Sequence, residues 1–167
     1  DRLTAIVGLS MAATPLLLML ASKLLPDKLA SDAREYDAIP QDRHPQVLIA
    51  GFGRFGQIIA RLLRAQGIAF IAIDPDIEQV NLSRQIGTDQ IYYGDPTRLA
   101  LLRSAGAARI RIFVVAINGV EASLRMVRLV RKHYPQARVF ARARDRRHAW
   151  QLVDLGAEAL RETFCSS

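Results

Sequence analysis

The sequence predicts an α/β protein built on a doubly wound parallel sheet, with one transmembrane helix before it, and three observations lead to this prediction. From Val47 onward, short apolar runs alternate with amphipathic stretches, which is typical of successive β-α-β units. A glycine-rich turn at residues 51–56 separates the first apolar run from the first amphipathic stretch. Residues 3–22 contain no charged side chain, and about twenty helical residues rise roughly 30 Å, the thickness of a bilayer core.

Length and composition limit the classes of protein to which the chain can belong. A chain of 167 residues has the size of one ordinary domain with a little left over, which argues against a multidomain enzyme with separate cofactor and substrate halves. The single cysteine, Cys165, excludes a disulfide scaffold and a four-cysteine metal site and favours a reducing compartment. Residues 46–167 carry eighteen bases against ten acids, a balance that suits nucleic acid, anionic lipid, a small anion or a neighbouring part of a larger assembly.

Residues 1–25 are expected to form a transmembrane helix, the last one of a polytopic membrane protein. Gly8 and Ser10 provide small side chains for close helix packing, and a proline such as Pro15 is tolerated inside a membrane bundle. A buried core helix is the alternative, because a few polar residues dilute the hydropathy. More Lys and Arg follow this stretch than precede it, so the basic-residue rule places residues 26–167 in the cytoplasm. The protein is expected in the inner (cell) membrane. Residues 26–45 hold three prolines and five acids and are expected to be a linker.

Residues 46–167 are expected to form the α/β domain. Its strands are predicted at five apolar runs, residues 47–50, 69–73, 90–93, 112–117 and 139–141. Because these runs are uninterrupted, the sheet should be covered on both faces. The first helix follows residue 53, with its apolar residues on one face, and further helices are expected at residues 76–86, 98–105, 119–133 and 146–155. Asp145 is a suitable N-cap for the last of these.

The glycine-rich turn has the form of a dinucleotide-binding fingerprint. It reads Gly51, Phe52, Gly53, Arg54, Phe55, Gly56, directly after a strand and directly before a helix, and Asp74 ends the next strand. In such a turn the first glycine permits the tight bend, the second lets a phosphate approach the backbone, and the third lets the helix pack closely on the sheet. The helix amides would bind the phosphate and Asp74 the adenine ribose. No base stands beside Asp74, so AMP, NAD or NADH is favoured over NADP. A glycine turn kept only for packing is the alternative.

Four more residues are predicted to lie on the same rim of the sheet. Asp95 and Thr97 follow the third strand, and Ala116 and Asn118 close the fourth. In doubly wound sheets, ligands bind at the carboxyl ends of the strands. Asp95 would reach the adenine or the ribose there, although the capping of the helix that begins near Arg98 is the favoured interpretation. Asn118 is equally suited to be a helix N-cap.

Several strings of the chain together resemble one bacterial family. VLIAGFGRFGQIIARLL, YGDPTR, LLRSAGA, ARARDRRH and RETF occur in this order, and the chain resembles the Kef family of glutathione-gated potassium efflux antiporters over nearly its whole length. The resemblance implies a last membrane helix, a linker and a Rossmann-like TrkA-N domain of the regulator-of-potassium-conductance (RCK) type. In that family the domain binds AMP or NAD(H), forms a homodimer, gates potassium/proton exchange and is not itself an enzyme.

The resemblance also implies the regulatory ligands and partners. Free glutathione holds such systems closed and its S-conjugates open them, and a flavodoxin-like ancillary subunit belongs to the family. The residues that match the family's glutathione site are Arg61, in the first helix, and Arg161, in the RETF string. Without the resemblance, both would be interpreted as solvated arginines, Arg161 in a terminal loop. Ile86 departs from the aromatic residue that the family can carry before the glycine that ends the second helix.

Two other functions share part of the evidence. An NAD-dependent dehydrogenase fragment would have the same fingerprint, but a dehydrogenase needs a substrate domain and an acid/base pair facing the nicotinamide. A nucleic-acid module would explain the basic residues, yet no reader motif is present in the sequence, and no nucleic-acid partner is expected.

The histidines, His44, His133 and His148, lack metal-site spacing and are expected at the surface or in caps. Trp150 is expected in the core.

Overall fold

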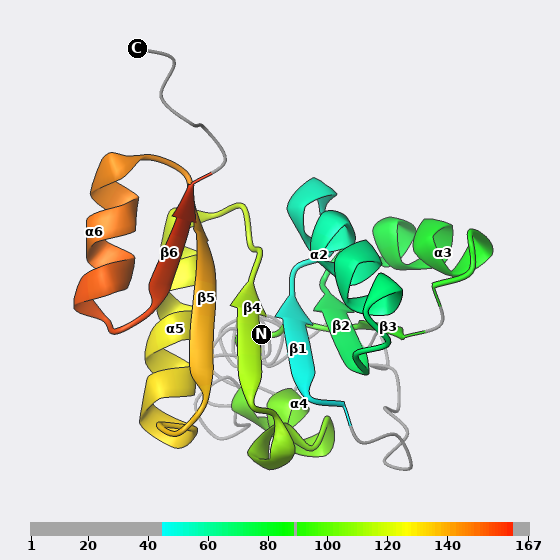
Figure 1. Ribbon diagram of the computed structural model, residues 1–167, viewed down its shortest axis with the longest axis horizontal. Coiled ribbons are helices and arrows are strands. Elements are labelled where there is room, and N and C mark those ends of the chain that lie inside the picture. The colour runs from blue at the N-terminus through cyan, green and yellow to red at the C-terminus, as the bar shows by residue number, and fades with distance from the viewer. Residues whose placement is uncertain (1–44, 89, 162–167) are drawn as a thin grey trace, which may run out of the picture. The chain divides into compact units, whose positions relative to one another are not determined.

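The computed structural model describes residues 45–88 and 90–161 (Figure 1). The strands are β1 Val47–Ala50, β2 Phe70–Asp74, β3 Ile91–Tyr93, β4 Ile112–Val115, β5 Arg138–Ala143 and β6 Glu158–Arg161. The helices are α2 Arg54–Ala65, α3 Ile77–Gln85, α4 Leu99–Ser104, the 3-10 helix Ala107–Arg109, α5 Val120–His133 and α6 Arg146–Asp154. The predicted membrane helix and linker lie outside these residues. In the parts described, no helix has the length and apolar character needed to span a membrane.

All six strands form one parallel sheet in the order β3-β2-β1-β4-β5-β6. The first strand, β1, lies at the centre of the sheet, and β2 and β3 follow toward one edge. The chain then returns to the centre, where β4 pairs with β1, and β5 and β6 follow toward the other edge. This is the topology of a doubly wound, Rossmann-like sheet, and the predicted fold class is confirmed. The change of direction leaves a crevice beside the carboxyl ends of β1 and β4, where such sheets bind ligands.

Apolar side chains cover both faces of the sheet, because successive residues of a strand point to opposite faces. Leu48 and Phe113 belong to a core cluster that includes residues of α4, α5 and α6. Val47 and Ile49 belong to a second cluster, packed against α2 and α3. All four side chains are at most 2 % exposed. Each apolar run of the sequence is therefore uninterrupted because alternate residues pack against the helix layers on the two opposite faces of the sheet.

Strand β6 and Trp150 differ from the sequence predictions. The sequence gives Arg161 a place in a terminal loop, but this residue ends β6, which pairs with β5. Only two of the four residues of β6 are apolar, and its side chains are mostly exposed. Because an edge strand of this kind has no apolar run, the sequence pattern did not predict it. The prediction of a core position for Trp150 is also wrong. Its side chain is 61 % exposed, and the Arg146 guanidinium lies 5.2 Å from its ring centre.

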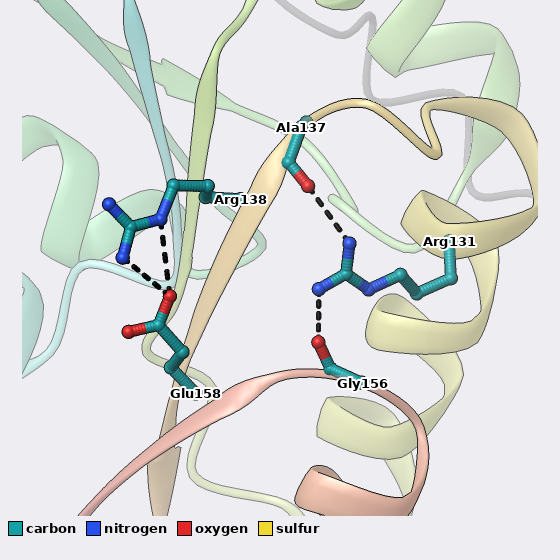
Figure 2. Close-up of polar contacts among 5 residues, drawn as sticks. All are labelled: Arg131, Ala137, Arg138, Gly156 and Glu158. Atoms are coloured by element: carbon teal, nitrogen blue, oxygen red, sulfur yellow. Dashed lines mark hydrogen bonds and ion pairs between the residues drawn. The ribbon is translucent and has the colours of Figure 1, made fainter.

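Polar contacts attach β6 to the rest of the sheet (Figure 2). The Arg131 guanidinium, from α5, donates one hydrogen bond to Ala137 O at 3.0 Å and another to Gly156 O. These two carbonyls lie just before β5 and just before β6. On the strands themselves, Arg138 and Glu158 form an ion pair at 2.7 Å. Arg131 therefore holds together the turns from which the last two strands start.

Substitution of Arg131 by methionine is expected to loosen β6. The change keeps the apolar stem but leaves two carbonyls without their donor, at a cost of about 1–3 kcal/mol. Hydrogen–deuterium exchange of residues 157–161 and the midpoint of urea unfolding measure the effect, and exchange should accelerate most in this segment. Arg128→Met, at an exposed position of the same helix, is the matched control. Equal exchange in the two variants would show that Arg131 does not anchor β6.

Candidate functional site

A cleft of about 350 Å³ opens at the carboxyl ends of the central strands. It lies at the crevice created by the change of chain direction between β1 and β4, as expected for a doubly wound sheet. The ends of β1, β2, β3 and β4 all contribute to its wall. It is lined by Gly51, Gly53, Asp74, Pro75, Asp76, Gln79, Asp95, Pro96, Thr97, Ala116, Ile117, Asn118, Gly119 and Ala122.

Two glycines of the turn are required by close backbone contacts. Gly51 has φ +94°, and a Cβ there would lie 2.9 Å from the carbonyl carbon and oxygen of Ala116. A Cβ on Gly56 would lie 2.3 Å from Gly51 O. No side chain fits at such distances, so these glycines let the end of β1, the end of β4 and the start of α2 come together. At Gly53 a Cβ would meet only Asn118 Nδ2, at 3.9 Å, so its small size leaves space in the cleft.

The positive end of α2 is open toward the cleft. Gly53 is the N-cap and has no side chain that could cap the helix, and the first turn contains no acid. The first intrahelical hydrogen bond runs from Gln57 N to Gly53 O at 3.0 Å, so the amides of the first turn have no acceptor within the helix. A helix start of this kind is suited to bind an anion such as a phosphate.

Asp74 also lines the cleft, and its carboxylate binds the backbone of the turn. It is 8 % exposed. One carboxylate oxygen accepts a hydrogen bond from Phe52 N at 2.5 Å and the other accepts one from Asp76 N at 2.8 Å. Burial raises the pKa of Asp74, and the two backbone hydrogen bonds act in the opposite direction. Each carboxylate oxygen has a second lone pair, so the group can still accept hydrogen bonds from ribose hydroxyls.

The structure corrects the capping roles considered for Asp95 and Asn118. Asp95 Oδ1 accepts hydrogen bonds from Thr97 N at 2.9 Å and Thr97 Oγ1 at 2.7 Å, whereas the N-cap of α4 is Arg98, without a side-chain cap. The N-cap of α5 is Gly119, and Asn118 Oδ1 instead accepts a hydrogen bond from Arg142 Nη1. All the rim residues predicted from the sequence line the cleft, including the buried Ala116.

Four residues of the predicted fingerprint, Phe52, Arg54, Phe55 and Gly56, do not line the cleft. Phe52 is 2 % exposed in the core and Phe55 packs against the same cluster. Gly56 is buried under the turn, and Arg54 is exposed outside the lining of the cleft. The sequence analysis missed Asp76 and Gln79, which also line the cleft. The signal for Asp76 was available, because an aspartate directly before a helix is a strong N-cap, and its carboxylate accepts from Glu78 N and Gln79 N.

The two arginines assigned to glutathione by resemblance lie on different parts of the sheet. Arg61, on α2, lines a small hollow of about 170 Å³ together with Arg64, Ile86 and Thr88. Arg161 is exposed at the end of β6, the strand at the opposite edge from β3. The hollow that Arg61 lines does not include Arg161.

His148 is buried, contrary to the expected surface or capping role. It is 2 % exposed, and its Nδ1 accepts a hydrogen bond from Arg144 N at 3.2 Å. Burial lowers the pKa of His148, while the charges of Asp145 and Glu121 partly oppose this shift. Asp145 is the N-cap of α6, as predicted, and accepts from His148 N at 2.8 Å. In the described part of the chain, no group of three or more His, Cys, Asp or Glu side chains is arranged to hold a metal ion.

Comparison with known proteins gives consistent matches. The model of the TrkA-N domain family matches residues 47–161. The glutathione-regulated potassium-efflux system protein KefC of Cronobacter sakazakii is 45% identical over 163 residues, 97% of this chain and 26% of that protein. The chain thus spans about a quarter of the length of the curated relatives it matches. The solved Kef C-terminal domain of Shewanella denitrificans in its AMP-bound form is 44% identical, with a TM-score of 0.63 over 71% of each chain. The structure of GsuK bound to ADP is 27% identical, with a TM-score of 0.62 over 71% of this chain and 30% of that one.

Proposed function

The chain belongs to the TrkA-N domain family and to the Kef proteins within it, and we propose that residues 46–167 form the nucleotide-binding gating domain of a glutathione-regulated potassium/proton antiporter. The observation that carries this proposal is the cleft in which the open start of α2 and the Asp74 carboxylate face one site. One is suited to bind phosphate and the other ribose, so together they fit a nucleotide, in the arrangement of the adenine-dinucleotide fingerprint. In this proposal the domain binds its nucleotide as a regulatory ligand and catalyses no reaction.

AMP or NAD(H) is the proposed ligand. The phosphate accepts hydrogen bonds from the amides of the first turn of α2, and the ribose hydroxyls donate to Asp74. A relative of 44% identity is described as AMP-bound and one of 27% identity as ADP-bound, which supports an adenine nucleotide. The acid at the end of β2 disfavours a 2′-phosphate, because Asp76 adds a second negative charge close to Asp74.

The domain is proposed to act on a membrane domain in the same protein. Residues 1–25 would be its last transmembrane helix and residues 26–45 the linker, so that the nucleotide domain lies in the cytoplasm under the inner membrane. The similarity to a potassium-efflux protein covers 97% of the chain and so includes nearly all of these residues. An NAD-dependent dehydrogenase would share the fold, but the relative of 45% identity is an efflux protein.

Glutathione and its S-conjugates are proposed to bind between two copies of the domain. Arg61 lines a hollow that does not include Arg161, which lies on the edge strand β6, and in this proposal a ligand that contacts both bridges two copies of the domain. Four exposed apolar side chains on and after α2 and α3 offer a surface for a second copy. They are Ile58, Leu62, Leu82 and Ile86. The basic faces of α5 and α6 are proposed to receive a flavodoxin-like ancillary subunit.

The test combines ligand binding with transport. Small molecules released from the purified chain are identified by mass spectrometry, and we expect AMP or NAD(H). Potassium efflux is then measured from vesicles that contain the whole transporter with this domain. Glutathione should close the pathway and an S-conjugate open it, and Arg61→Ala should weaken both responses. Arg125→Ala, at an exposed position of α5, is the control. A chain that binds no adenylate, or a flux indifferent to glutathione, would overturn the proposal.

A further inference from the structure

A second hollow, of about 250 Å³, adjoins the nucleotide cleft. It is lined by Ile117, Asn118, Arg142, Arg144 and His148, and it shares the first two with the cleft. Asn118 is the wall between the two spaces. Its Nδ2 lies 3.9 Å from the position that a Cβ on Gly53 would take, and its Oδ1 accepts a hydrogen bond from Arg142. A ligand that extends past the phosphate site therefore meets Asn118 and then the second hollow.

The histidine in this hollow carries a hydrogen-bond donor for which the described residues supply no acceptor. His148 Nδ1 accepts from Arg144 N, so the neutral ring has its proton on Nε2. This Nε2 is buried and has no hydrogen-bond partner among residues 45–88 and 90–161. Buried polar side-chain atoms nearly always have a partner, and an exception calls for an explanation. An acceptor supplied by a ligand would explain it.

The charges around the hollow select an anionic acceptor. Two of its five lining residues are arginines and none is an acid. The nearby acids Asp145 and Glu121 line a separate hollow that His148 also borders, and the Asp145 carboxylate accepts a hydrogen bond from His148 N. Guanidinium groups bind phosphate oxygens through paired, charge-assisted hydrogen bonds. Arg142 is only partly exposed and contacts Asn118, so its guanidinium already lies at the boundary with the cleft.

We propose that this hollow is a subsite for the second phosphate of the bound nucleotide, the terminal phosphate of a nucleoside diphosphate or the second phosphate of a dinucleotide. The inference rests on the proposed function of the neighbouring cleft. Arg142 exchanges Asn118 Oδ1 for a phosphate oxygen, and His148 Nε2 donates to the same group. A monophosphate ends before this point and leaves both contacts unmade. The subsite thus distinguishes AMP from longer adenylates, which gives the domain two ligand-bound forms that differ at the ends of β4 and β5.

The proposal is tested by calorimetric titration of the purified chain with AMP, ADP and NADH. In His148→Asn, the asparagine keeps an acceptor for Arg144 N but removes the distal ring nitrogen. In Arg142→Gln, the amide keeps a donor for Asn118 but removes the charge. Each variant should weaken ADP and NADH binding by about tenfold, the effect of one lost charge-assisted hydrogen bond, and change AMP binding by less than about twofold. Arg125→Gln, which removes the same charge from α5, should affect all three ligands equally.

The outcomes separate this inference from the proposed function. If the natural chain binds no AMP, the function assigned to the cleft fails. If AMP binds but neither variant weakens ADP or NADH more than AMP, the subsite is overturned while the cleft stands. Loss of ADP binding alone assigns the subsite to a terminal phosphate, and loss of NADH binding alone assigns it to a dinucleotide. Thermal unfolding checks that the variants are folded, and Arg142→Gln, at a partly exposed position, provides the test if His148→Asn does not fold.

Discussion

Substitution of Gly56 by alanine is expected to unfold the domain or to lower its free energy of unfolding by more than about 3 kcal/mol. A Cβ at this position would lie 2.3 Å from Gly51 O and 3.3 Å from Gly51 C. Both are backbone atoms of the turn, so no side chain can rotate to relieve the clash. Overpacking in a core typically costs about 1–3 kcal/mol, and more when the backbone must move. The loss of near-ultraviolet circular dichroism and the midpoint of urea unfolding measure the effect.

Gly53→Ala is the matched control for this prediction. Its Cβ would approach only Asn118 Nδ2, at 3.9 Å, and its φ of −65° suits any residue. The variant should unfold close to the natural chain, within about 1 kcal/mol, but bind AMP more weakly because the methyl group takes up space in the cleft. If Gly56→Ala were as stable as Gly53→Ala, the close approach of α2 to the end of β1 would not exist in the protein.

Asp74→Asn is expected to weaken AMP binding by about a hundredfold. The substitution removes the charge that accepts hydrogen bonds from the ribose, and two such bonds are together worth about 3 kcal/mol or more. An asparagine also has only one acceptor oxygen for the amides of Phe52 and Asp76, which now bind separate carboxylate oxygens. The free energy of unfolding should therefore fall by about 1–3 kcal/mol as well. Isothermal titration with AMP and with inorganic phosphate measures the binding change.

Asp76→Asn provides the comparison at a neighbouring carboxylate. Asp76 caps α3 through the amides of Glu78 and Gln79, and asparagine is about as good an N-cap as aspartate. This variant should keep AMP binding within a few fold of the natural chain and should unfold at nearly the same urea concentration. If Asp74→Asn and Asp76→Asn weakened AMP equally, the ribose contact would not be specific to Asp74. Phosphate affinity should change little in either variant, since the amides of α2 remain.

The sequence predicts most of the fold because its signals are local. The strands at residues 47–50 and 112–115 are short apolar runs. The turn at residues 51–56 predicts the position of the cleft, because close backbone contacts require glycine at fixed positions in such a turn. Strand β6 was missed since an edge strand needs only backbone pairing to β5 and shows half-polar, exposed side chains. Trp150 was misplaced for a related reason: Ala149 and Leu152 already fill the buried face of α6.

The second hollow could not be predicted from sequence patterns. It depends on the meeting of the end of β4, the end of β5 and the first turn of α6, which only the strand order brings together. Histidine in particular gives no local signal for burial. The capping role of Asn118 failed for the same reason, because Arg142 from β5 donates to its side-chain oxygen. Asp95 failed for a local reason, because its carboxylate accepts hydrogen bonds from Thr97, two residues further on. Their positions on the rim followed from the ends of the strands, but their partners did not.

The attachment of Asp74 to the amide of Phe52 has a consequence for signalling. The protein's own atoms hold the phosphate loop in its binding shape, so the receptor is preorganised and a nucleotide should enter and leave without remodelling the main chain. In a domain of this kind, folding of the loop cannot be the structural change that distinguishes one bound nucleotide from another. A difference between two bound nucleotides must therefore appear in the side chains at the rim of the cleft, and from there in any surface that packs against those side chains.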